Sequence, residues 1–143
     1  MREFLTKSPQ ETEALGEEIA QEVSIGAIVL LFGELGTGKT TLARGICRSL
    51  QISSQVKSPS FIIVNTYSGK VTVYHIDLYR IRESNPTLTG ELLEYIWDKD
   101  AIKIVEWAER IPGEIVPKNA IKITLERISK SERKITIFED KAQ

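Results

Sequence analysis

The sequence has few of the features that mark secreted and membrane proteins. Cys47 is the single cysteine among 143 residues, so no disulfide can form within the chain, which favours a reducing compartment. No apolar run approaches the length that spans a membrane, and the N-terminus has no apolar signal-peptide segment. These absences predict a soluble, cytoplasmic protein.

An excess of charge of one sign is also lacking. The chain has 19 Lys and Arg against 20 Asp and Glu, a net charge of −1. So small a charge creates no overall field that would draw the protein to nucleic acid or to an anionic membrane, so we expect no tight, unaided binding to nucleic acid. The length and the ordinary apolar and charged fractions predict one globular domain spanning residues 1–143.

Residues 33–40, with the sequence GELGTGKT, match the phosphate-binding loop pattern G-x-x-x-x-G-K-[ST]. An apolar run typical of a buried strand precedes the loop at 27–32, and apolar residues at helical spacing follow it at 41–50. Glycines let the main chain approach phosphate oxygens, and a helix N-terminus presents N–H groups to an anion. Lys39 would place a positive charge on the β and γ phosphates, and the Thr40 hydroxyl would ligate magnesium. The loop therefore predicts nucleotide binding, and the absence of an N-K-x-D motif favours ATP over GTP.

A phosphate-loop protein also needs an acidic residue at the end of a neighbouring strand to hold magnesium. Asp77 ends the strand-like run at 71–77, and Glu106 lies near the end of the run at 101–107. The residues leave open which of these carboxylates faces the metal, and either would orient the attacking water directly or through the metal. His75, the only histidine, is interpreted as a structural hydrogen-bonding group rather than a base.

Some residues around this predicted site have both a functional and a structural interpretation. Ser58 and Ser60 flank a proline in either a loop that senses the γ-phosphate or a simple polar turn. Arg80 and Arg82 either supply positive charge to the transition state or are ordinary surface residues. Trp107, next to Glu106, is expected to shape the site, whereas Cys47 is expected to fill the core.

The rest of the chain predicts an α/β domain. Ser8 is a helix N-cap, with Pro9 at the first helical position and Glu11 completing a capping box. The remaining predicted elements are hairpin strands at 61–67 and 71–77, a short helix at 91–97, a strand at 101–107, a second hairpin at 120–126 and 134–138, and irregular segments at 51–57 and 82–90. This order predicts a single P-loop NTPase-like domain whose mixed parallel and antiparallel sheet is flanked by helices.

Four blocks of the sequence together resemble the TsaE (YjeE) family. They are GELGTGKTT at 33–41, SPSF at 58–61, HIDLYR at 75–80 and EW at 106–107. The phosphate loop is shared by very many ATPases, whereas the H-x-D-x-Y-R block followed by E-W is far more discriminating, and the resemblance covers nearly the whole chain. One departure is Ser60, where the family usually has threonine; serine keeps the hydroxyl.

The resemblance implies a small bacterial ATPase that is needed for threonylcarbamoylation of the adenosine beside the anticodon of certain tRNAs. In that system TsaD with its partner TsaB carries out the transfer to tRNA, and TsaE hydrolyses ATP so that the complex turns over. By position, Thr40 and Glu106 would ligate magnesium, and Asp77 would be essential for hydrolysis. Lys39 would contact phosphate. The residues expected at ATP are Glu34, Leu35, Gly36, Thr37, Gly38, Lys39, Thr40, Thr41, Trp107 and Glu109.

Two alternatives come from other functional classes. Many small-molecule kinases share the phosphate loop, but they usually have an arginine-bearing lid, and no convincing lid segment follows Glu106. In the second alternative, the chain is a nucleotide-gated binding module that hydrolyses negligible nucleotide until a partner completes the site.

Overall fold

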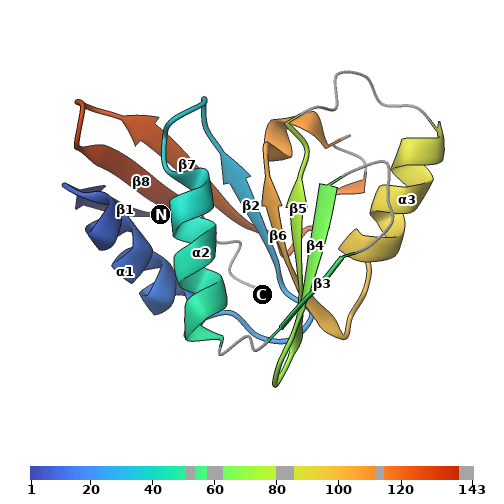
Figure 1. The fold of residues 1–143 in the computed structure, drawn as a ribbon. Coiled ribbons are helices and arrows are strands. Elements are labelled where there is room, and N and C mark those ends of the chain that lie inside the picture. Colours follow the sequence, from blue (N-terminus) through green and yellow to red (C-terminus); the bar gives the residue numbers. More distant parts are fainter. Residues whose placement is uncertain (51–53, 58–62, 80–85, 112–114, 139–143) are drawn as a thin grey trace.

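The computed structural model describes residues 1–50, 54–57, 63–79, 86–111 and 115–138. Figure 1 shows one mixed sheet with helices packed against it. The elements are β1 (Arg2–Thr6), α1 (Pro9–Ala20), β2 (Ile28–Phe32), α2 (Lys39–Ser49), β3 (Ser54–Lys57), β4 (Ile63–Ser68), β5 (Thr72–Asp77), α3 (Pro86–Ile96), β6 (Ala101–Glu106), the 3₁₀ helix η1 (Ala108–Arg110), β7 (Ile121–Arg127) and β8 (Arg133–Phe138).

The described part of the sheet has 8 strands in the order β1-β8-β7-β2-β6-β5-β4-β3. Its centre is parallel, because β2 pairs in parallel with both β6 and β7, and β6 pairs in parallel with β5. Antiparallel hairpins extend both edges, β4 with β5 and β7 with β8. The predicted hairpins and mixed sheet are confirmed. The central strands β2 and β6 are almost wholly buried, as strands covered on both faces should be. β2 is entirely apolar, whereas β6 also contains the buried charged residues Lys103 and Glu106.

The helices cover opposite faces of this sheet, as Figure 1 shows for α1 and α2 on one side and α3 on the other. Val29 and Leu31 of β2 pack in the core beneath α1 and α2, whereas Ile28 and Leu30 pack in the core beneath α3. This alternation follows from the two-residue period of a strand. α1 and α2 approach each other through glycine: a Cβ added at Gly45 would lie 2.1 Å from the carbonyl oxygen of Glu13.

The predicted helix start before α1 is confirmed for Ser8 as the N-cap and for Pro9 at the first helical position. Ser8 has extended backbone, and its hydroxyl accepts a hydrogen bond of 3.1 Å from the Glu11 N–H, a helix N–H group that has no partner inside the helix. The Glu11 carboxylate accepts a bond of 2.9 Å from the N–H of Lys7, one residue before the N-cap, so the capping box differs from the predicted one in this partner. No helix in the described ranges is long and apolar enough to cross a membrane.

Three expectations about secondary structure were wrong or incomplete. Residues 54–57, predicted to be irregular, form the edge strand β3, which pairs through its backbone with β4 and so needs no apolar pattern. Residues 86–90, predicted to belong to a loop, are instead the first residues of α3, which begins at Pro86 because proline is tolerated at the first helical position. The short edge strand β1, which pairs with β8, was not predicted from the sequence.

Candidate nucleotide-binding site

The phosphate loop connects β2 to α2, as its sequence predicts. Gly36 has φ 81° and Gly38 has φ 97°, values that residues with a Cβ rarely adopt. Gly38 is also the N-cap of α2, so the helix N-terminus opens directly onto the loop. The arrangement of buried strand, glycine loop and helix N-terminus directs main-chain N–H groups toward an anion.

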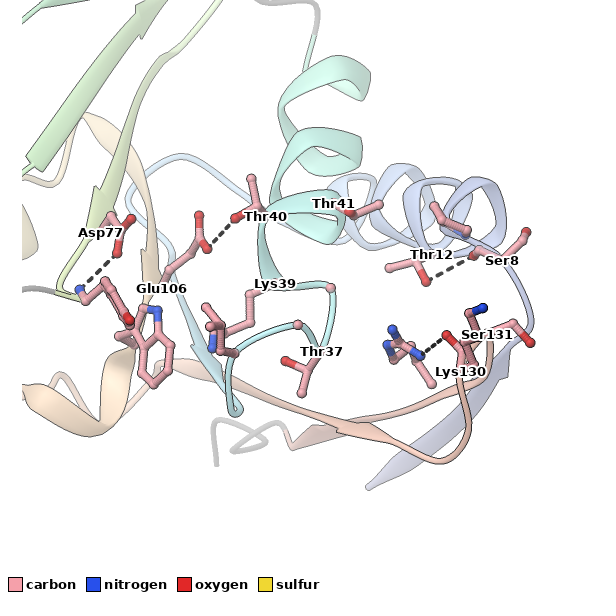
Figure 2. A pocket seen from close by; sticks show the side chains of 17 residues that line it. Ser8, Thr12, Thr37, Lys39, Thr40, Thr41, Asp77, Glu106, Lys130 and Ser131 are labelled. Carbon is pink, nitrogen blue, oxygen red and sulfur yellow. Dashed lines mark hydrogen bonds between the residues drawn. The ribbon is translucent and has the colours of Figure 1, made fainter.

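The loop forms one wall of a cavity of about 450 Å³. Figure 2 shows Lys39, Asp77 and Glu106 at one end, and Ser8, Thr12, Lys130 and Ser131 at the other. The lining residues are Ser8, Pro9, Thr12, Leu35, Gly36, Thr37, Gly38, Lys39, Thr40, Thr41, Asp77, Tyr79, Glu106, Trp107, Lys130, Ser131 and Arg133. Concave cavities of this size are typical of small-molecule sites.

Glu106 is a buried carboxylate, 4% exposed, with a hydrogen-bond partner on each oxygen. Its Oε1 accepts a bond of 2.7 Å from the Thr40 hydroxyl, and its Oε2 lies 2.5 Å from Nε2 of His75. Desolvation raises the pKa of Glu106, but the hydrogen bond and charge of His75 and the hydrogen bond of Thr40 outweigh it. The net pKa lies below its usual value, so Glu106 is ionised at neutral pH.

Asp77 lies beside Glu106, because β5 and β6 are parallel and these two residues are register partners. Its Oδ1 accepts a hydrogen bond of 2.9 Å from the N–H of Tyr79, so the carboxylate caps the turn after β5 while still lining the cavity. The structure therefore brings both predicted acids to one end of the cavity, with Glu106 as the acid that contacts Thr40.

Lys39 is 5% exposed although it carries an ammonium group. Its Nζ donates hydrogen bonds to the carbonyl oxygens of Gly33 and Glu34 and lies 3.6 Å from the centroid of the Trp107 ring. Desolvation lowers the pKa of Lys39, although the nearby carboxylates, with Glu109 the largest contributor, oppose that shift. A desolvated ammonium at the loop is well placed to attract an incoming phosphate.

Trp107 shapes this end of the cavity, as the sequence predicts. It has φ 58°, a left-handed conformation that is uncommon for a large side chain. Its ring lies 5.0 Å from that of Tyr79 and 5.3 Å from the guanidinium of Arg110. This backbone turn, at the start of η1, brings the ring over the Lys39 ammonium.

The oxygen donors at this end are of the kind that binds magnesium. In the described residues, no group of three or more His, Cys, Asp and Glu side chains could hold a metal alone. Magnesium, however, usually keeps several waters and binds through one or two carboxylates together with substrate phosphates. The Thr40 hydroxyl and Glu106 carboxylate, 2.7 Å apart, are a donor pair of this kind.

Most of the residues predicted at the nucleotide line the cavity, but two do not. Glu109 instead contacts the start of the loop, where its Oε2 accepts a bond of 3.3 Å from the N–H of Gly33. Glu34 belongs to the loop, and its carbonyl accepts a bond of 2.9 Å from the Thr37 hydroxyl. Ser58, Ser60, Arg80 and Arg82 lie outside the described residues.

The residues that line the end of the cavity distant from Lys39 were not predicted from the sequence. Ser8 and Thr12 come from the start of α1, Lys130 and Ser131 come from the β7–β8 turn, and Arg133 is the first residue of β8. Ser8 was assigned only as a helix cap, and the charged turn only as a hairpin connection. No local motif marks these residues, because the two segments lie far apart in sequence and meet only in the folded sheet.

Cys47 and His75 have the structural settings that the sequence predicts. Cys47 packs against the core beneath α1 and α2, and burial raises the pKa of its thiol to about 11. His75 contacts Glu106 but does not line the cavity. The thiol therefore packs against the core, and the imidazole is a hydrogen-bonding partner of Glu106.

A phosphate loop between a buried parallel strand and a helix, with carboxylates at the ends of adjacent strands, defines a P-loop NTPase-like fold. The family model for "Threonylcarbamoyl adenosine biosynthesis protein TsaE" matches residues 6–135. The chain belongs to the TsaE family, as its motifs predict.

Relatives and a solved structure agree with this assignment. A TsaE protein of tRNA threonylcarbamoyladenosine biosynthesis from Synechocystis is 42% identical over 117 residues, which cover 77% of this chain and 72% of the relative. The protein of the same name from Aquifex aeolicus is 33% identical over 142 residues, 96% of each chain. The crystal structure of Bacillus subtilis YdiB superimposes with a TM-score of 0.77 at 31% identity, covering 96% of this chain and 84% of that one.

Proposed function

We propose that this protein is a magnesium-dependent ATPase whose hydrolysis of ATP lets a TsaD–TsaB complex turn over during threonylcarbamoylation of tRNA adenosine. The observation that carries the ATPase part is the end of the cavity where Lys39, the loop and the Thr40–Glu106 pair meet. The part played by TsaD, TsaB and tRNA rests on membership of the TsaE family. With this role we expect the protein to work in the cytoplasm.

The cavity has a direction that suits a nucleoside triphosphate. The terminal phosphates would lie at the loop, where Lys39 and the N-terminus of α2 supply positive charge and N–H donors. The nucleoside would then extend toward Ser8 and Thr12, which line the other end, and toward Lys130 of the β7–β8 turn. ATP would in this way contact the start of α1 and the β7–β8 turn, two segments that the sequence did not predict at the site.

In the proposed reaction, water attacks the γ-phosphate and ADP leaves. Thr40 and Glu106 would hold magnesium, which when bound would offset the negative charge of the phosphates. Lys39 would donate to a phosphate oxygen, and the ammonium charge would stabilise the charge that develops there. Asp77 would orient the water through its carboxylate, which lines the cavity beside Glu106.

The test has two stages. Calorimetry should detect ATP and ADP binding that strengthens with magnesium, and phosphate should be released in buffer without any acceptor molecule. Adding TsaD and TsaB should change the rate of phosphate release. Absence of magnesium-assisted nucleotide binding would refute the nucleotide site. Phosphate release that depends on a small-molecule acceptor would identify a kinase instead, and binding without release even with TsaD and TsaB would identify a nucleotide-gated module.

A further inference from the structure

His75 reaches the site only through Glu106. Its Nε2 lies 2.5 Å from Oε2 of Glu106, and its side chain is 13% exposed. Glu106 lines the cavity, whereas His75 does not. The imidazole therefore lies behind the carboxylate, on the side away from any bound nucleotide.

We propose that His75 is a positioning residue that holds the Glu106 carboxylate with one oxygen directed at Thr40, and so sets the affinity of the site for magnesium. This inference rests on the proposed function. A carboxylate rotates readily about its last side-chain bond, because that torsion has broad minima. A donor at Oε2 removes this freedom and directs Oε1 to the Thr40 hydroxyl, 2.7 Å away.

The position of the imidazole is itself well determined. His75 is on the same face of β5 as Asp77, and in the parallel pairing with β6 its register partner is Ile104, two residues before Glu106. From the other side the Tyr67 ring of β4 stacks on the imidazole, with centroids 6.5 Å apart and planes 27° apart. Two neighbouring strands thus hold the ring against the carboxylate.

Hydrogen bonds to a metal-binding carboxylate from outside the ligand set commonly change metal affinity by tenfold to a hundredfold. Removal of the donor that fixes the Glu106 carboxylate should therefore weaken magnesium binding. Nucleotide binding in the absence of magnesium should hardly change, because His75 does not line the cavity.

The experiment compares wild type with His75→Leu, His75→Gln and Tyr74→Phe. Glutamine places an uncharged N–H donor near the position of Nε2. Tyr74→Phe is the matched control. It removes another side-chain hydrogen bond of β5, the bond of 2.8 Å from the Tyr74 hydroxyl to Asp98, and leaves Glu106 untouched. For each protein, ADP affinity is measured by calorimetry in EDTA and across a magnesium titration, so no readout depends on catalysis.

We expect His75→Leu to raise the magnesium concentration for half-maximal enhancement of ADP binding by about tenfold to a hundredfold. ADP affinity in EDTA should stay within about twofold, His75→Gln should recover most of the loss, and Tyr74→Phe should behave as wild type. Unchanged magnesium dependence in His75→Leu, or an equal loss in Tyr74→Phe, would overturn the inference alone. Wild-type protein that shows no magnesium-assisted binding would instead overturn the proposed function and the inference together.

Discussion

The sharpest test of the phosphate site is replacement of Lys39 by methionine, which keeps the length of the side chain and removes its charge. In the structure the ammonium has three N–H donors, and the carbonyls of Gly33 and Glu34 accept two of them. A phosphate oxygen would compete with the Trp107 ring for the third. The free energy that Lys39 contributes to phosphate binding is therefore the attraction between ammonium and phosphate minus the contact that the ammonium loses with the Trp107 ring.

The size of this difference can be worked out from the geometry. Opposite unit charges about 4 Å apart attract by about 4 kcal/mol where the effective dielectric constant is near 20. The contact of the ammonium with the Trp107 ring is worth about 1–2 kcal/mol. The net loss in Lys39→Met is then about 2–3 kcal/mol, which corresponds to roughly 30- to 150-fold weaker binding of ADP.

Lys130→Met is the matched control, because Lys130 lines the same cavity from the β7–β8 turn but is exposed. An exposed charge contributes about 0–1 kcal/mol, so its loss should weaken ADP binding by less than about fivefold. Calorimetric titrations with ADP at one magnesium and salt concentration measure both effects. Equal losses in the two variants would show that only the total charge of the cavity matters, and an unaffected Lys39→Met would refute a phosphate role for the loop.

Three further predictions follow from the geometry. Asp77→Ala should bind ATP within about fivefold of wild type but release phosphate at least about a hundredfold more slowly, since an acid that orients water contributes that much; a normal rate would make Asp77 purely structural. Gly45→Ala should lower the free energy of unfolding in urea by about 3 kcal/mol because its Cβ would meet the backbone of Glu13, whereas Gly90→Ala, in open space on α3, should raise it by up to about 1 kcal/mol. Equal effects of the two glycine changes would contradict the close packing of α1 on α2. Because folding lowers the pKa of Glu106, its contribution to stability is present above the unfolded value near 4.5 and is lost as the pH falls through the folded value. The stability advantage of wild type over Glu106→Gln, measured in EDTA by urea denaturation, should therefore shrink from about pH 7 to about pH 3, and a constant advantage would contradict the lowered pKa.

The neighbouring carboxylates show how far sequence reasoning reaches. The apolar runs before Asp77 and Glu106 predict two strands that end in acids, and the structure pairs these strands in parallel with the two acids in register. The strand type and the strand ends follow from local pattern. Which acid contacts Thr40 does not follow from it, because that depends on how α2 packs over the sheet.

In β3 and α3 the observed secondary structure differs from the predicted one, also because of tertiary contacts. β3 has a polar sequence and becomes a strand only because the edge of β4 is available for pairing. The helix α3 contains Gly90, which counts against a helix when only neighbouring residues are considered, yet its Leu92 and Ile96 pack in the core on that face of the sheet. In both segments tertiary contacts outweigh the local preference.

By itself, the sequence determined the phosphate loop and the helix that follows it, because a short run of consecutive residues encodes each of them. It also determined the membership of the family, because four short motifs in a fixed order mark it. Only the tertiary structure decided that Glu106 contacts both His75 and Thr40, and that the start of α1 and the β7–β8 turn line the other end of the cavity. The physical reason is that these contacts join segments distant in sequence. Their side chains meet only when strand register and helix packing have already been established.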